Sequence, residues 1–222
     1  MFSDLQLTFK DNREQFNEDF RLRIHRSLSW LQRAEQARQE QDIDSQFIFL
    51  WISFNAAYAK DLGAGLRSTD KGTFVEFINR ICYLDSQQNI YHAVWDKFSG
   101  SIRILLNNQF TFQSFWDYHN GLTTEQAWLE GFVKNRNKAL NALTSKDTST
   151  VLISVFNHLY TLRNQIIHGG STFNSTINRS QVKDASNILS TIVPEMLQVM
   201  LNNPHEKTWG KPFYPVVKLA EL

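Results

Sequence analysis

The residues best suited to chemistry lie in one short stretch, residues 163–170, which reads Arg-Asn-Gln-Ile-Ile-His-Gly-Gly. At about 100° per residue, the apolar residues before it form one helical arc, and Arg163 falls near the middle of that arc. A guanidinium is costly there unless a partner neutralises it or the site opens to a ligand. Asn164 and His168 are four residues apart and share a different face. A permanent cation near a titratable imidazole suits phosphate-ester chemistry.

The glycine pair that follows predicts where this helix ends, because glycine readily adopts the left-handed conformation that stops a helix. His168 then lies at the negative end of the helix dipole, a position that stabilises a cation. The competing interpretation gives these residues no chemical role. In it, Arg163 forms a buried ion pair and His168 merely ends a helix.

Three stretches of the chain together resemble the HEPN superfamily. The Arg-Asn-x-x-x-His string and its glycines are similar to the Arg-x4–6-His motif of that superfamily, here with four intervening residues. Residues 27–35 (SLSWLQRAE) and 47–58 (FIFLWISFNAAY) resemble the first two helices of its Apea-like branch. The similarity covers about residues 13 to 200 and implies an all-α, HEPN-like helical bundle.

The resemblance also implies a range of activities. Many HEPN proteins are metal-independent ribonucleases, often toxins or phage-defence effectors, whereas others only bind. In a ribonuclease, His168 would act as general base on an RNA 2′-hydroxyl, or as acid to the leaving oxygen. Arg163 would neutralise the charge that grows on the phosphoryl group, and Asn164 would bind a phosphate oxygen or fix the imidazole. The product would carry a 2′,3′-cyclic phosphate, and no metal or other cofactor would be required.

A second copy of the chain is expected, because one histidine does not easily serve as both base and acid in one step. HEPN enzymes commonly pair two motifs across a two-fold axis, which implies a homodimer with both His168 side chains in one cleft. The apolar helix predicted at about residues 45–62 is compatible with a dimer contact, and a monomeric core helix explains it equally well. RNA and a cognate antitoxin or regulatory protein are the other partners expected.

Asn55 is the predicted supporting residue. It interrupts an aromatic helix at a position expected to be buried, where an amide must find partners. One interpretation is a structural hydrogen bond to the backbone. The other, which the family likeness favours, is that Asn55 orients Arg163 or His168 from an adjacent helix.

Basic residues gather at Lys134, Arg136 and Lys138, and Arg179 and Lys183 follow the motif loop. Such clusters are usually solvated helix faces. If they flank the motif cleft, they would supply phosphate contacts that salt weakens. The net charge of only +1 gives no global case for nucleic-acid binding, so an RNA site must rest on a local patch.

Composition indicates a packed helical protein without a metal centre. Hydrophobic residues make up 42% of the chain and aromatic residues 13%. The aromatic residues from Phe110 to Tyr118 offer base stacking, but burial in the core is their more ordinary role. The single cysteine, Cys82, excludes a disulfide framework, and no histidine shows metal-ligand spacing. Without a visible secretory signal or an apolar run of roughly 20 residues, we expect a cytoplasmic protein with no membrane contact.

Hydrophobic periodicity predicts one helical domain over residues 1–222. Core helices are expected at about 12–62 and 123–203, with an inserted helical segment at about 64–122 and a packed tail at 204–222. The individual helices are predicted at about 12–39, 45–62, 73–84, 87–106, 123–143 and 180–201. The helix that carries the motif is predicted to start after the cap cluster at residues 147–149 and to end at the glycine pair after His168. Gly63-Ala64-Gly65 is expected to end the second helix, and Gly100 to kink or split the fourth.

The leading interpretation is therefore a metal-independent endoribonuclease of HEPN type. The first alternative is a non-catalytic HEPN-like protein that binds RNA, a nucleotide or a protein partner. The second is a structural helical subunit in which the motif stabilises a dimer. An enzyme predicts that Arg163 and His168 are accessible in a shared groove, whereas a structural role predicts that an acidic or carbonyl partner seals Arg163.

Overall fold

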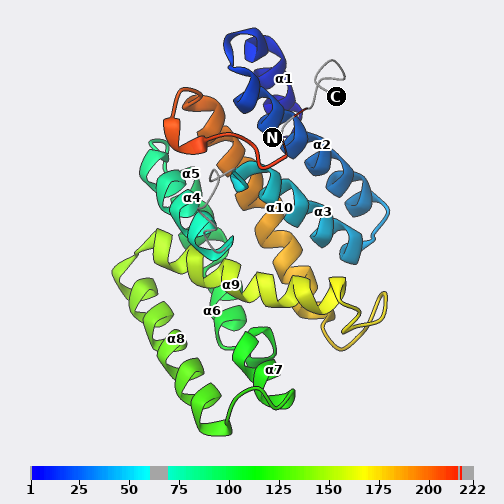
Figure 1. The fold of residues 1–222 in the computed structure, drawn as a ribbon, viewed down its shortest axis with the longest axis vertical. Helices are drawn as coiled ribbons and strands as arrows, with labels where there is room; N and C mark the ends of the chain where they lie inside the picture. The colour runs from blue at the N-terminus through cyan, green and yellow to red at the C-terminus, as the bar shows by residue number, and fades with distance from the viewer. Residues whose placement is uncertain (1, 61–69, 215, 217–222) are drawn as a thin grey trace.

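The computed structural model describes residues 2–60, 70–214 and 216 of the chain. These residues form α-helices and short turns of 3-10 or π-helix (Figure 1). Their one β-type pairing is an isolated bridge between Lys60 and Pro212. The predicted all-α helical bundle is therefore confirmed as a fold class.

The α-helices of the described residues are connected mostly by short loops. In chain order they are α1 Phe2–Asn12, α2 Glu18–Gln39, α3 Ile43–Tyr58, α4 Asp70–Leu84, α5 Asn89–His92, α6 Ser99–Leu106, α7 Gln113–His119, α8 Glu125–Ser145, α9 Thr148–Ile167 and α10 Arg179–Asn202. Between them lie the 3-10 helices η1 Arg13–Gln15, η3 Gln109–Thr111 and η4 Lys207–Trp209, and the π-helical turn η2 Ala93–Lys97.

Helix α3 is central to the core, packed between α2 and α10. Two serines allow α2 and α3 to approach closely: the Ser27 hydroxyl donates to the Ser53 carbonyl at 2.7 Å, and the Ser53 hydroxyl donates to the Ser27 carbonyl at 2.8 Å. Phe47, Leu50 and Phe54 are almost completely buried on α3. The apolar character of this helix is thus accounted for within a single chain.

A buried cation joins the end of α3 to the C-terminal segment. Arg23 of α2 is 0% exposed, and its Nη1 donates to the carbonyls of Ala57 and Ala59, each at 2.8 Å. Its Nη2 donates to the carbonyl of Trp209 at 2.9 Å. Burial lowers the pKa of Arg23 to about 10, which still leaves it charged at neutral pH. These bonds hold residues 209–210 against the bundle.

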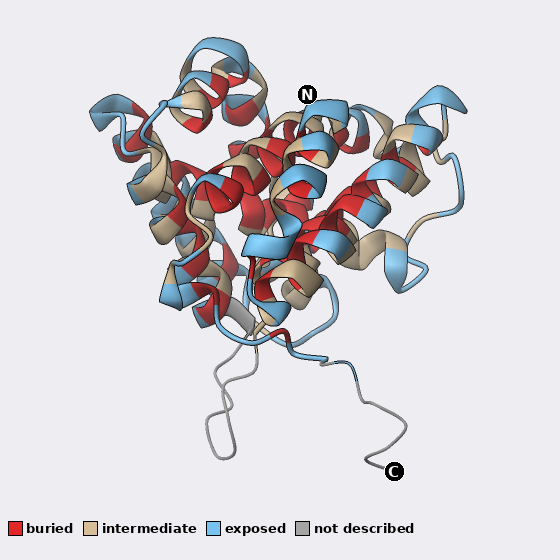
Figure 2. Cartoon of the chain, turned by 90° about the horizontal axis from the view of Figure 1, so that it is seen from above, coloured by how far each residue is buried: buried red, intermediate tan, exposed pale blue. Residues whose placement is uncertain are grey.

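Helix α9 crosses the middle of the molecule and is the element that positions the candidate site (Figure 1). It contacts α3 and α4 on one side and α6 and α8 on the other. The segment predicted as an insertion supplies α4 to α7, and buried apolar side chains of α4, α5 and α6 belong to the same core as those of α3 and α10. Buried positions follow the inward faces of the helices, and exposed positions follow the outward faces (Figure 2).

The predicted helix at 12–39 was wrong at its start. Residues 2–12 already form α1, and the chain breaks at η1 before α2 begins. Phe16 is buried in an extended conformation, and the Asn17 side chain accepts a hydrogen bond from the Phe20 amide at 2.9 Å. An N-cap of this kind starts a new helix, which the continuous apolar stripe concealed.

The predicted helix at 87–106 is divided, but at Phe98 and not at Gly100. The turn η2 is π-helical, and the Trp95 indole within it donates to the Thr148 hydroxyl at 3.0 Å. Such turns insert a residue into a helix and change its direction. The predicted stop at residues 63–65 lies outside the described residues. The other helix bounds differ from those predicted by a few residues.

Candidate functional site

The motif helix α9 has the two ends that its sequence predicts. The Asp147 side chain caps its start by accepting from the Thr150 amide at 3.1 Å. At its far end, Gly169 has a φ of +72° and the Gly170 amide donates to the Gln165 carbonyl at 2.7 Å. A left-handed glycine therefore stops the helix just after His168.

Arg163 is half-buried and has no counter-ion among the described residues. Its Nη1 donates to the Asn164 side-chain oxygen at 2.9 Å, while its Nε is buried with no hydrogen-bond partner. No ion pair joins it to any residue that the structure describes. By contrast, two other partly buried arginines are neutralised, Arg80 by Glu206 and Arg179 by Asp44. The charge of Arg163 is thus available to an anionic ligand.

His168 is exposed at the C-terminal cap of α9. Its backbone amide donates to the Asn164 carbonyl at 3.0 Å, so the two residues are stacked on one helix face. Asn164 therefore accepts a hydrogen bond from the Arg163 guanidinium and lies one turn before His168. Among the described residues, no acidic or backbone carbonyl partner seals Arg163.

Asn55 does not join this group. Its side-chain oxygen is buried on α3 without a hydrogen-bond partner. None of the hydrogen bonds found among residues 2–60 and 70–214 connects its side chain to the backbone, to Arg163 or to His168. Neither predicted partner of Asn55 is therefore present in the described structure.

The predicted basic residues fall into two different settings. Lys134, Arg136 and Lys138 are exposed on α8. Arg179, in contrast, binds Asp44 with two parallel bonds of 3.0 Å from Nη1 and Nη2. Asp44 also accepts from the Asn174 amide at 2.7 Å. This arrangement holds the loop after α9 against the start of α3, and the Asp44 carboxylate neutralises the charge of Arg179.

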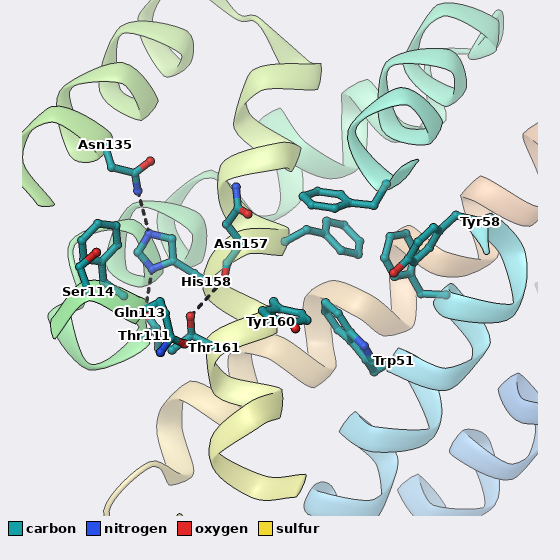
Figure 3. Close-up of a pocket in the computed structure, with 14 residues that line it drawn as sticks. Trp51, Tyr58, Thr111, Gln113, Ser114, Asn135, Asn157, His158, Tyr160 and Thr161 are labelled. Carbon is teal, nitrogen blue, oxygen red and sulfur yellow. Dashed lines mark hydrogen bonds between the residues drawn. The ribbon is translucent and has the colours of Figure 1, made fainter. Parts of the chain in front are cut away.

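A cavity of about 570 Å³ lies along α9, and sequence reasoning did not find it. Five segments contribute to it, which no short motif could indicate: α3, α4, the η3–α7 junction, α8 and α9 (Figure 3). Its lining residues are Trp51, Phe54, Tyr58, Phe74, Thr111, Phe112, Gln113, Ser114, Asn135, Phe156, Asn157, His158, Tyr160 and Thr161.

His158 is the middle member of a hydrogen-bonded chain at this cavity (Figure 3). Its Nδ1 lies 2.8 Å from the Thr111 hydroxyl, and its Nε2 lies 3.4 Å from the Asn135 side-chain nitrogen. The Thr111 hydroxyl donates to the Asn108 carbonyl at 2.9 Å, so it accepts from Nδ1–H and leaves Nε2 as an acceptor. Burial lowers the pKa of His158 to about 4, so the ring is neutral at pH 7.

The walls of the cavity combine aromatic rings with uncharged polar groups. Trp51 and Tyr160 lie with ring centroids 6.1 Å apart, and Asn135 and Asn157 approach from α8 and α9 (Figure 3). The side-chain amide of Asn157 makes no hydrogen bond with any described residue. Every lining residue in the described structure is uncharged at pH 7. The cavity is therefore built for a neutral ligand and not for a phosphate.

One face of α9 runs from this cavity to the motif. Asn157 and Thr161 line the cavity, and Asn164 and His168 continue the same face within about 60° of arc. Elements on both sides flank this face. On one side, the Gln165 side chain donates to the Phe110 carbonyl of η3 at 2.6 Å. On the other, α3 contacts α9.

Comparisons with protein-family models, curated proteins and solved structures give no match for this chain. The described residues include no group of three or more His, Cys, Asp or Glu side chains arranged to hold a metal ion. None of the described helices is long and apolar enough to cross a membrane.

Proposed function

We propose that this chain is a metal-independent endoribonuclease of HEPN type that acts as a homodimer, in a toxin or phage-defence setting. The observation that carries the proposal is the half-buried guanidinium of Arg163, which has no counter-ion among the described residues and donates to Asn164, one helical turn before the exposed His168. A cation of this kind attracts a phosphate, and an imidazole moves protons near neutral pH.

The chemistry proposed is transfer of the phosphoryl group to a neighbouring hydroxyl. One His168 takes the proton of the RNA 2′-hydroxyl, whose oxygen then attacks phosphorus. The bond from phosphorus to the 5′-oxygen breaks, and His168 of the second copy returns a proton to that oxygen. Arg163 stabilises the extra negative charge on the phosphoryl oxygens. The products are a 2′,3′-cyclic phosphate and a 5′-hydroxyl, so atoms and charges balance without a metal.

Exposed apolar side chains beside the motif support the proposed dimer. Ile167 is 46% exposed, and the following loop presents Phe173 at 76% and Ile177 at 85%. Apolar groups that gather at one place on a surface commonly mark a contact site. A second copy seated on this loop would cover them and bring the two His168 side chains toward one cleft.

Cleavage of RNA by the purified protein in EDTA tests the proposal. We expect cyclic phosphate ends from the wild type and a loss of at least about 100-fold in rate for His168→Ala, the usual contribution of general acid–base catalysis. The matched control is His205→Ala, which removes another exposed histidine and should leave the rate unchanged. Absence of cleavage, or equal cleavage by the wild type and His168→Ala, would refute the ribonuclease.

Binding without catalysis is the second candidate, and the cavity beside α9 favours it. A pocket of this volume with aromatic walls and a few polar groups is typical of ligand sites. In that case the chain would bind RNA, a nucleotide or a protein partner such as an antitoxin, and the cleavage assay would be negative for every variant.

A further inference from the structure

We propose that the cavity beside α9 receives one unstacked base of the RNA substrate and so sets the sequence preference of cleavage. This inference rests on the proposed function in one respect, because that function identifies RNA as the molecule that carries the base. Its chemistry, recognition of a neutral planar heteroaromatic ring, is argued from the cavity alone.

The aromatic wall provides the stacking surface that such a ring needs. Trp51, Phe156 and Tyr160 lie together, with centroids 6.1 Å apart for both Trp51–Phe156 and Trp51–Tyr160. Tyr160 is 46% exposed, so its ring is accessible from solvent. Stacking of a base on an aromatic side chain contributes about 1–3 kcal/mol.

The polar wall provides hydrogen bonds of both kinds for the edge of a base. A side-chain amide has two N–H donors and an oxygen acceptor, so it can form a pair of hydrogen bonds with the edge of a base. Asn157 has its whole amide free of bonds to described residues, and Asn135 uses one N–H on His158. Because no charged residue lines the described cavity and His158 is neutral, a base is favoured there over a phosphate.

The position of the cavity fits a base whose backbone reaches the motif. Thr161, at the cavity, and Asn164 lie on one face of α9 and are separated by about 4.5 Å along the helix axis. The corresponding rise from Thr161 to His168 is about 10 Å. A nucleotide seated in the cavity can therefore place an adjacent phosphate near Arg163 and His168.

Binding to a protein that does not cleave tests the cavity separately from catalysis. In a His168→Ala background, we would measure the affinity for single-stranded oligoadenylate, oligocytidylate, oligoguanylate and oligouridylate, and for the four free nucleosides. We expect one base to be preferred. Asn157→Leu should weaken its binding at least tenfold, equivalent to about 1.4 kcal/mol. Asn157→Asp keeps the shape of the side chain and should change which base is preferred, because it removes the N–H donors.

The matched control is Asn137→Leu, which changes an exposed asparagine on α8 outside the cavity. It should leave affinity and preference unchanged. Thermal unfolding of each variant establishes that the fold is retained. Equal affinity of Asn157→Leu, Asn157→Asp and the parent protein for every oligonucleotide would overturn the inference.

The remaining outcomes separate this inference from the proposed function. Base-selective binding without cleavage by the wild type would support the cavity and refute the ribonuclease. Cleavage whose site preference is the same in the wild type, Asn157→Leu and Asn157→Asp would support the ribonuclease and refute the base subsite. Tight binding of a free nucleoside that does not compete with RNA would assign the cavity to a small molecule and overturn its role in RNA recognition.

Discussion

At the scale of single residues, Arg163 is at odds with the stability of the fold. A half-buried guanidinium with an unpartnered Nε costs free energy that a neutral side chain of similar length avoids. We expect Arg163→Met to unfold at the same temperature as the wild type or higher, and to cleave RNA at least about 100-fold more slowly. Calorimetry and the cleavage assay measure the two effects. A marked fall in melting temperature would show that the guanidinium is structural.

Protonation of His158 should make stability depend on pH. The pKa of His158 is about 4 in the folded protein, against an ordinary value of 6.5 that applies to the unfolded chain. Well above pH 6.5 the imidazole is neutral in both the folded and the unfolded state, so it does not reduce the free energy of unfolding there. As the pH falls from 6.5 to 4, the unfolded chain binds a proton that the folded chain resists. Stability is lost across that window, by at most about 1.4 kcal/mol per pH unit.

The measurement is urea unfolding of the wild type and His158→Gln at pH 6.5 and pH 5. The carboxylates titrate alike in both proteins, so the difference isolates the imidazole. We expect the wild type to lose about 1.5 kcal/mol more than the variant over this interval. Parallel losses in the two proteins would contradict a neutral, buried His158.

Sequence reasoning could find the motif but not the cavity, for a physical reason. Asn164 and His168 are four residues apart on one helix, so helical geometry alone predicts that they share a face, and Arg163 directly precedes them in the sequence. Asn135 and His158 meet only because α8 packs against α9. Contacts of that kind depend on tertiary packing, which a local pattern does not contain.

At the scale of elements, the loop after α9 is held by an ion pair. Asp44 binds Arg179 and the Asn174 amide, with only 13% of its side chain exposed. We expect both Asp44→Asn and Arg179→Gln to destabilise the fold by about 1–2 kcal/mol, between the values for surface and buried pairs. Amide hydrogen exchange should accelerate in residues 169–178 of both variants.

RNA affinity distinguishes this structural role from the predicted phosphate contact. If Arg179 binds RNA, Arg179→Gln weakens binding whereas Asp44→Asn, which frees the guanidinium, does not. We expect the two variants to behave alike. The matched control is Lys183→Gln, which neutralises an exposed cation on the same helix.

The elements themselves were predicted best where caps and apolar periodicity agree, as for α8 and α9. They were predicted worst where a tertiary contact overrides a local pattern. The break before α2 depends on burial of Phe16, and the π-helical turn accompanies the bond from Trp95 to Thr148. Neither contact can be seen in the pattern of the segment that it interrupts.

At the scale of the whole molecule, activity should depend on association of two copies. The double variant Phe173→Ser, Ile177→Ser removes apolar groups that are exposed in the single chain, so the fold should be unaffected. We expect it to sediment as a monomer and to lose cleavage together with dimerisation. Leu122→Ser, at another site 76% exposed, is the control for loss of surface hydrophobicity. A wild type that cleaves as a monomer would refute the shared cleft.

The hydrogen bonds of the buried Arg23 have a consequence for folding during synthesis. The guanidinium donates to the carbonyls of Ala57 and Ala59 at the C-terminal end of α3, whereas its bond to Trp209 spans 186 positions of sequence. On a ribosome that adds roughly 5–20 residues per second, α2 and α3 emerge on the order of ten seconds before Trp209. During that interval the buried cation lacks part of its acceptors. The contact between α2 and α3 is therefore completed only late in synthesis, and nascent chains should remain sensitive to protease until residues 209–210 are released.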